Sequence, residues 1–179
     1  MSSTPTRPGG ALWAFATAFY GRPGIEAALL GLQDEDGVDV PILIALLYAG
    51  LQGLALAPEQ LGALLDTALT WQAKAIAPLR VARRALKSAA GDTPDTERET
   101  LRAQVTSAEL AAERLLINRL EALLPLAIAT EPATAIQGNL KAYLASLPQP
   151  LSESGRMRLA LLVTDAEASG DSWSGIHRN

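Results

Sequence analysis

The chain has 179 residues and a formal net charge of −4; 49 % of its residues are hydrophobic, 4 % are aromatic, and none is cysteine. The length allows one domain with a substantial core, and the acidic balance disfavours general binding to nucleic acid or to an acidic membrane surface. The lack of cysteine excludes disulfides, thiolate catalysis and cysteine-ligated metals. Because alanine and leucine dominate the apolar content, the composition predicts an all-α fold.

The first part of the chain contains three short predicted helices. Residues 1–10, rich in Ser, Thr, Pro and Gly, are expected to be disordered. Apolar residues at helical spacing predict helices at 11–20 and at about 25–33, and residues 34–37, three acidic residues and a glycine, are expected to form a turn. In the third helix, 40–51, nearly every side chain is apolar, so we expect it to be surrounded by protein.

Two long amphipathic segments follow, separated by a Gly/Pro turn at residues 91–94. Long helices joined by so short a turn predict an antiparallel hairpin. Pro78 lies inside the first of them and is expected to kink or divide it, because proline removes one backbone hydrogen bond and clashes with the preceding turn. We therefore predict compact N-terminal helices packed on a long kinked hairpin.

The C-terminal part carries a weaker helical signal, with shorter helices expected near 133–147 and 152–167. The predicted organisation is a disordered N-terminus at 1–10, a helical domain at 11–124, a looser helical extension at 125–168 and a disordered tail at 169–179. The longest apolar run, Val40 to Leu51, is well short of the ~20 residues of a membrane span. We expect no membrane insertion and a cytoplasmic location.

An ordered series of motifs covers residues 12–51: Leu12-Trp13, Tyr20, Pro23-Gly24-Ile25-Glu26-Ala27, Leu32-Gln33-Asp34 and Gly37-Val38-Asp39-Val40-Pro41-Ile42-Leu43. With Trp71, residues 78–80 and residues 109–110, the series resembles an uncharacterised proteobacterial family, domain of unknown function 2390, over about residues 11–124. Two positions depart from the family pattern: Pro41 stands where that pattern has asparagine, and Tyr48 lies where a tryptophan is expected nearby. The resemblance implies a bacterial cytoplasmic helical protein of unknown activity and gives no residue a catalytic role.

The residues that usually carry enzyme chemistry are missing or badly spaced. Counted from Asp34, Gly37 is fourth and Ala45 twelfth, whereas a calcium loop needs glycine at the sixth position and glutamate at the twelfth. The one histidine, His177, lies in the tail, and no nucleophile elbow is present. We therefore expect no catalytic, cofactor or metal residues, no cofactor, and no enzymatic activity.

Two polar groups are nevertheless candidates for binding. Glu26 and Asp39 could meet near Arg22 and Tyr20 as a polar cluster, although each also has a sufficient local role: Glu26 at a helix N-terminus, Asp39 as a cap, and Arg22 as the partner of one of them. The second candidate is an anion-binding face with spacing i, i+3, i+4, i+7, formed by Arg80, Arg83, Arg84 and Lys87. The alternative is that this face pairs across the hairpin with Glu97, Glu99 and the acidic N-terminal half.

The aromatic residues are concentrated in the N-terminal half and form either a packing core or the wall of an apolar pocket, with Trp13, Tyr20, Tyr48 and Trp71 as the candidate lining. Trp13 in particular is expected to be mostly buried against helix 40–51. The leading hypothesis is a non-enzymatic protein-interaction or adaptor module whose partner is another protein, with nucleic acid disfavoured. The alternative is a small apolar-ligand-binding protein that uses the aromatic pocket.

Overall fold

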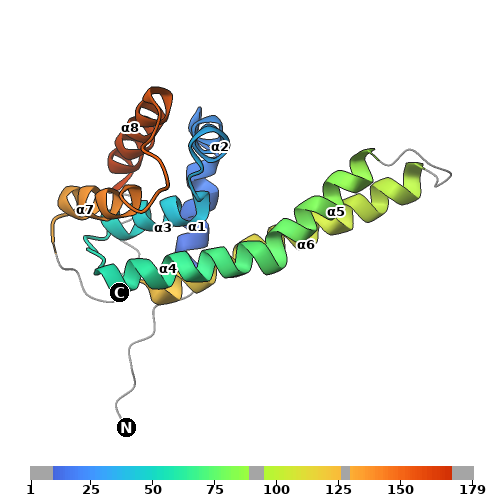
Figure 1. Cartoon of the computed structure of the whole chain (residues 1–179), viewed down its shortest axis with the longest axis horizontal. Coiled ribbons are helices and arrows are strands. Elements are labelled where there is room, and N and C mark those ends of the chain that lie inside the picture. Colours follow the sequence, from blue (N-terminus) through green and yellow to red (C-terminus); the bar gives the residue numbers. More distant parts are fainter. Residues whose placement is uncertain (1–9, 89–94, 126–129, 171–179) are drawn as a thin grey trace, which may run out of the picture.

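The computed structural model describes residues 10–88, 95–125 and 130–170, and within them every regular element is helical. α1 (Ala11–Tyr20), α2 (Ile25–Asp36), α3 (Val40–Leu51), α7 (Pro132–Leu144) and α8 (Glu153–Ala168) gather at one end of the molecule (Figure 1). α4 (Pro58–Trp71), the π-helix η1 (Gln72–Ile76), α5 (Ala77–Ser88) and α6 (Asp95–Leu123) form an elongated pair. The predicted all-α class is confirmed.

The helix α3 lies at the centre of the core, as its uniformly apolar sequence predicted. Every residue of α3 except Pro41 is buried. The Asp39 carboxylate caps the helix by accepting a hydrogen bond of 3.0 Å from the backbone N–H of Ile42. Such a cap satisfies one of the N–H groups that a helix start leaves without a partner. The predicted cap and helix are confirmed.

The predicted acidic turn is instead the last turn of α2. Asp34, Glu35 and Asp36 are helical, and the helix ends at Gly37, which has φ 69°. Two of these carboxylates are held by the distant helix α8 and its start: Glu35 pairs with Arg158 at 2.6 Å, and Asp36 accepts from the backbone N–H of Ser152 at 2.6 Å. These long-range contacts favour the helical state, and local sequence cannot show them.

The α4–η1–α5 segment packs along α6, and the two run antiparallel. The indole N–H of Trp71 donates to the carbonyl of Ala112 at 2.8 Å, whereas Arg83, farther along the first segment, meets Glu109, earlier in α6. The turn expected at residues 91–94 lies outside the described residues. The first segment is divided close to Pro78, as expected: the π-helix η1 ends at Ile76, two residues before Pro78, and separates α4 from α5.

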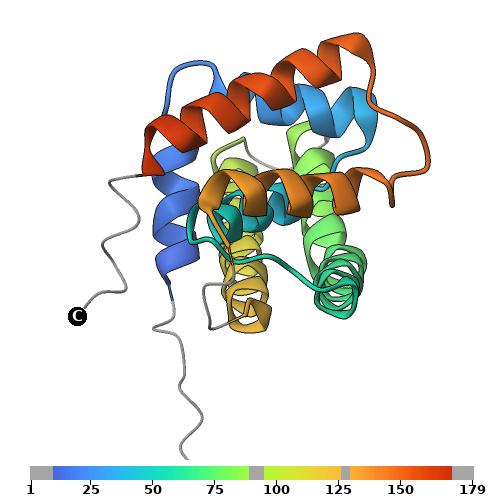
Figure 2. The same ribbon diagram turned by 90° about the vertical axis from the view of Figure 1, so that its left-hand side faces the viewer.

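The helices α7 and α8 are part of the core, not the looser extension that we expected. Figure 2 shows α7 lying across α3 and α8 running alongside α2. The buried amide of Asn139 donates to the carbonyl of Leu54 and accepts from the N–H of Leu56, both at 2.9 Å. The buried Tyr143 hydroxyl accepts from the N–H of Asp39 at 2.8 Å. The C-terminal helices therefore close the core around α3 and hold its flanking loops.

Candidate functional site

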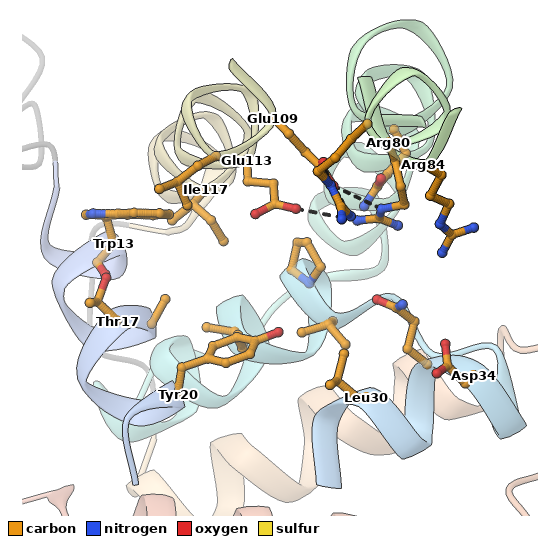
Figure 3. Close-up of a pocket in the computed structure, with 18 residues that line it drawn as sticks. Trp13, Thr17, Tyr20, Leu30, Asp34, Arg80, Arg84, Glu109, Glu113 and Ile117 are labelled. Atoms are coloured by element: carbon orange, nitrogen blue, oxygen red, sulfur yellow. Dashed lines mark hydrogen bonds and ion pairs between the residues drawn. The ribbon is translucent and has the colours of Figure 1, made fainter. Parts of the chain in front are cut away.

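A cavity of about 620 Å³ opens between α1, α2, α3 and the middle of the long helical pair (Figure 3). Its size lies within the range of about 300–1,000 Å³ that small-molecule sites occupy. One wall is mostly apolar and the facing wall is charged, so the cavity is amphipathic.

The apolar wall is built by the inner faces of the N-terminal helices and by part of α6. It is lined by Trp13, Ala16, Tyr20, Leu30, Val40, Pro41, Ile44 and Ile117. Ile44 and Ile117 are buried, and Trp13 and Tyr20 are partly buried and packed on the same core. The parts of this wall on α3 and α6 thus belong to the packed core.

The charged wall is formed by α5 and α6, and we call its four residues, Arg80, Arg83, Glu109 and Glu113, the Arg–Glu cluster. The Glu109 carboxylate accepts from Nε of Arg80 at 3.1 Å and from Nε of Arg83 at 2.6 Å. Arg80 also reaches Glu113, at 3.4 Å. The side chain of Glu109 is 8 % exposed, against 29 % and 31 % for the two arginines. Glu109 is therefore the buried centre that fixes two guanidinium groups at the cavity.

The two glutamates of the cluster differ in electrostatics. Burial acts to raise the pKa of Glu109, but the hydrogen bonds and charges of Arg83 and Arg80 outweigh it and hold that pKa below its ordinary value. For Glu113, burial and the negative charge of Glu109 raise the pKa above its ordinary value, and the arginines oppose this only in part. Glu109 is the firmly ionised member of the pair.

Tyr20 places a phenol on the apolar side of the cavity. Burial and the charges of Glu113 and Glu26 raise the pKa of Tyr20 to about 12, with Arg80 opposing them. Its hydroxyl makes no hydrogen bond with the residues that the structure describes. The phenol is therefore protonated at neutral pH and can donate a hydrogen bond to a ligand.

The four aromatic residues predicted to line a pocket are divided between pocket and core. Trp13 and Tyr20 line the cavity. Tyr48 is 1 % exposed and packs against the ring of Phe15, at a centroid distance of 5.5 Å. Trp71 does not line the cavity but packs under the guanidinium of Arg119, at 4.9 Å. We had expected Trp13 to be mostly buried, but it is only partly buried, in the wall of the cavity.

The predicted polar cluster of Arg22, Glu26 and Asp39 is not assembled by the contacts of these residues. Arg22 pairs with Asp165 of α8 at 2.5 Å and donates to the hydroxyl of Ser169. Asp39 caps α3, and burial raises its pKa while the hydrogen bond from Ile42 opposes the rise. Glu26 is exposed in the first turn of α2. The three residues serve local structure, and the expected pairing of Arg22 with Glu26 or Asp39 is replaced by the pairing with α8.

The predicted basic face lies partly at the site. Arg80, Arg83 and Arg84 line the cavity, whereas the exposed Lys87, one turn farther along α5, does not. Arg80 and Arg83 do pair across to α6, but with Glu109 and Glu113 instead of the expected Glu97 and Glu99. Glu99 pairs with Arg102 within α6.

Sequence reasoning missed the two cluster glutamates and the contribution of α2 and η1 to the lining. Glu109 and Glu113 stand at spacing i, i+4 on a helix stripe that otherwise carries Ala112 and Leu116 toward the core. Two acidic residues within an apolar stripe were the available signal, because a buried carboxylate requires a cationic partner. Leu30, Gln33, Asp34 and Gln72, which also line the cavity, gave no comparable signal.

A family model for a protein of unknown function, DUF2390, matches residues 11–120. The chain belongs to the DUF2390 family. The matched segment contains α1 to α5 and most of α6, and with them every residue that lines the cavity; α7 and α8 lie outside it. No curated protein and no solved structure matches the sequence.

Two further properties of the described residues bear on the kind of site. No cluster of three or more His, Cys, Asp or Glu side chains suited to a metal ion occurs among them, and the acidic end of α2 is engaged by α8. None of the helices in the described part of the chain is long and apolar enough to cross a membrane.

Proposed function

We propose that this DUF2390 protein is a non-enzymatic binding protein whose cavity between α1, α2, α3, α5 and α6 takes one small amphipathic molecule. The observation that carries the proposal is the pairing of a fixed apolar wall with a charged wall around about 620 Å³. Sites for small molecules typically combine mostly apolar surface with a few convergent polar groups. The apolar part of the ligand would lie against Trp13 and Ile44, and its polar part would face the Arg–Glu cluster.

The contacts of the walls support binding without large rearrangement. Ile44 and Ile117 belong to the buried core, and Glu109 holds Arg80 and Arg83 from α6. A site that is already formed avoids the entropic cost of ordering its side chains on binding. This arrangement favours the apolar-ligand hypothesis over the adaptor hypothesis for the cavity itself.

The test is binding of a neutral fluorescent probe, N-phenyl-1-naphthylamine, to the full chain. We expect saturable binding at one site, weakened by Thr17→Phe, because Thr17 lines the cavity and a phenyl ring there would take up part of the space open to the probe (Figure 3). Ala18→Phe is the matched control, since Ala18 is the next residue of α1, is exposed and does not line the cavity. Equal binding by wild type and Thr17→Phe, with both chains folded by circular dichroism, would refute the proposal.

A second candidate function is that of a protein-interaction module. It is favoured by α5 together with the half of α6 that packs on it, which we call the α5–α6 arm. The arm extends away from the other helices in Figure 1, and it carries exposed Val81 and Leu101. If the arm binds a partner protein, Val81→Glu and Leu101→Glu should abolish recovery of that partner and leave probe binding unchanged. Recovery of the same partner by both variants would refute this candidate.

A further inference from the structure

The arginines of the charged wall carry more hydrogen-bond donors than the facing carboxylates engage. A guanidinium carries about five N–H donors. Arg80 gives two hydrogen bonds to Glu109 and Glu113, and Arg83 gives two to Glu109. Both oxygens of Glu109 are thereby engaged. Among the residues that the structure describes, no acceptor takes up more than half of the N–H donors of these two arginines, so this part of the wall has excess donors.

The rest of the lining includes the side chains of Arg84 and Tyr20 and one further carboxylate, that of Asp34. Arg84 also lines the cavity, and its side chain lies beside that of Arg80 in Figure 3. Tyr20 lies on the opposite side, where its protonated hydroxyl is available as a donor. The group that best satisfies several guanidinium N–H donors is an anionic oxygen acceptor, because charge-assisted hydrogen bonds of this kind are the strongest and Arg matches carboxylate geometry.

Glu113 can yield its place to such a group. It accepts from Arg80 at 3.4 Å, whereas Glu109 accepts from Arg80 at 3.1 Å and from Arg83 at 2.6 Å. Its partly buried carboxyl is also easier to protonate than an ordinary glutamate, because its pKa is raised. An incoming carboxylate can therefore replace Glu113 as the second acceptor of Arg80 without breaking the pairs at Glu109.

We propose that the ligand is an amphipathic acid, with a carboxylate or related anionic head at Arg80, Arg83 and Arg84 and an apolar body against Trp13, Ile44 and Ile117. This inference rests on the proposed function and adds to it the charge and orientation of the ligand. The two ends of the molecule are recognised by different elements: the head by α5, and the body by α1, α3 and α6.

The test compares ligands with one tail and different heads: decanoate, decan-1-ol and decylamine, each measured by calorimetry and by displacement of N-phenyl-1-naphthylamine from the full chain. We expect decanoate to bind about tenfold more tightly than decan-1-ol, the usual effect of hydrogen bonds to a charged group, and decylamine to bind most weakly. Acetate and inorganic phosphate, which supply an anion without a tail, should not displace the probe.

The substitution Arg84→Gln tests whether the head group binds at α5, and Lys87→Gln is its matched control. Arg80 and Arg83 are left unchanged because they hold Glu109. We expect Arg84→Gln to weaken decanoate about five- to tenfold and to leave decan-1-ol unchanged, while Lys87→Gln changes neither by more than about twofold.

The outcomes separate this inference from the proposed function. Tightest binding by decan-1-ol or decylamine would overturn the anionic head and leave the binding cavity standing. Displacement by acetate or phosphate at the concentration of decanoate would show a simple anion site and overturn the amphipathic acid. Equal losses in Arg84→Gln and Lys87→Gln would overturn the placement of the head. Failure of both the probe and decanoate to bind would overturn both proposals.

Discussion

Replacing Gly50 with alanine tests whether α7 is an integral part of the core. A Cβ atom at Gly50 would lie 2.8 Å from Cα and 2.9 Å from the backbone nitrogen of Ile136 in α7. Carbon atoms normally approach to about 3.5–4.0 Å, and these neighbours are backbone atoms that cannot rotate away. The helices α3 and α7 must therefore move apart.

The expected free-energy change combines two effects. Overpacking of a core costs about 1–3 kcal/mol, and replacing a helical glycine with alanine returns about 0.5–1 kcal/mol. We expect Gly50→Ala to lower the free energy of unfolding by about 1–2 kcal/mol, which lowers Tm by about 3–6 °C for a domain of this size. Gly138→Ala in α7 is the matched control: nothing lies near its added Cβ, so it should gain about 0.5–1 kcal/mol.

The assay is urea unfolding followed by circular dichroism, together with amide hydrogen exchange. If Gly50→Ala releases α7 without global unfolding, the amides of α7 will lose protection while those of α3 keep it. Equal stability and equal α7 protection in the two variants would show that α7 does not pack closely on α3, and the description of the core would be refuted.

Three further predictions concern charged groups. Glu109→Gln should lower the free energy of unfolding by about 1–2 kcal/mol at neutral pH, less than the ~3–5 kcal/mol of a fully buried pair because Arg80 and Arg83 remain partly hydrated. The pKa of Glu109 is lowered in the folded state, so its ionised carboxylate stabilises the fold above about pH 4.5. This stabilisation is lost as the pH falls through the folded-state pKa, and the unfolding curves of wild type and variant should therefore converge in acid. Glu113→Gln should be neutral or stabilising at pH 7, because its raised pKa disfavours the ionised form in the folded state; a loss equal to that of Glu109→Gln would contradict the assignment. Asp39→Ala should cost about 1 kcal/mol through loss of the α3 cap, whereas exposed Asp34→Ala should be nearly neutral by the same urea assay.

The parts of the fold that could be predicted from sequence are those with local causes. The apolar composition of residues 40–51 and the cap at Asp39 were enough to locate α3 and its burial. The integration of α7 depends on contacts across a long stretch of chain, such as Asn139 with Leu54 and Tyr143 with Asp39. No local pattern encodes these pairings, so the C-terminal helices looked looser than they are.

The site was predictable to a similar extent. Helical spacing located the basic face of α5, and aromatic content pointed to Trp13 and Tyr20. The partner of the basic face could not be chosen from sequence, because the register of α5 on α6 depends on η1, where the π-turn changes the helical phase before Arg80. Tyr48 was indistinguishable from a pocket residue until its burial beside Phe15 was known.

The most direct test of the binding cavity is an isotope-filtered NOESY spectrum of the labelled full chain with bound N-phenyl-1-naphthylamine. We expect cross-peaks from the probe to Trp13, Ile44 and Ile117, which come from three helices and all line the cavity. Cross-peaks confined to exposed residues of the α5–α6 arm, such as Val81 and Leu101, would show that the probe binds the surface and would contradict binding in the cavity.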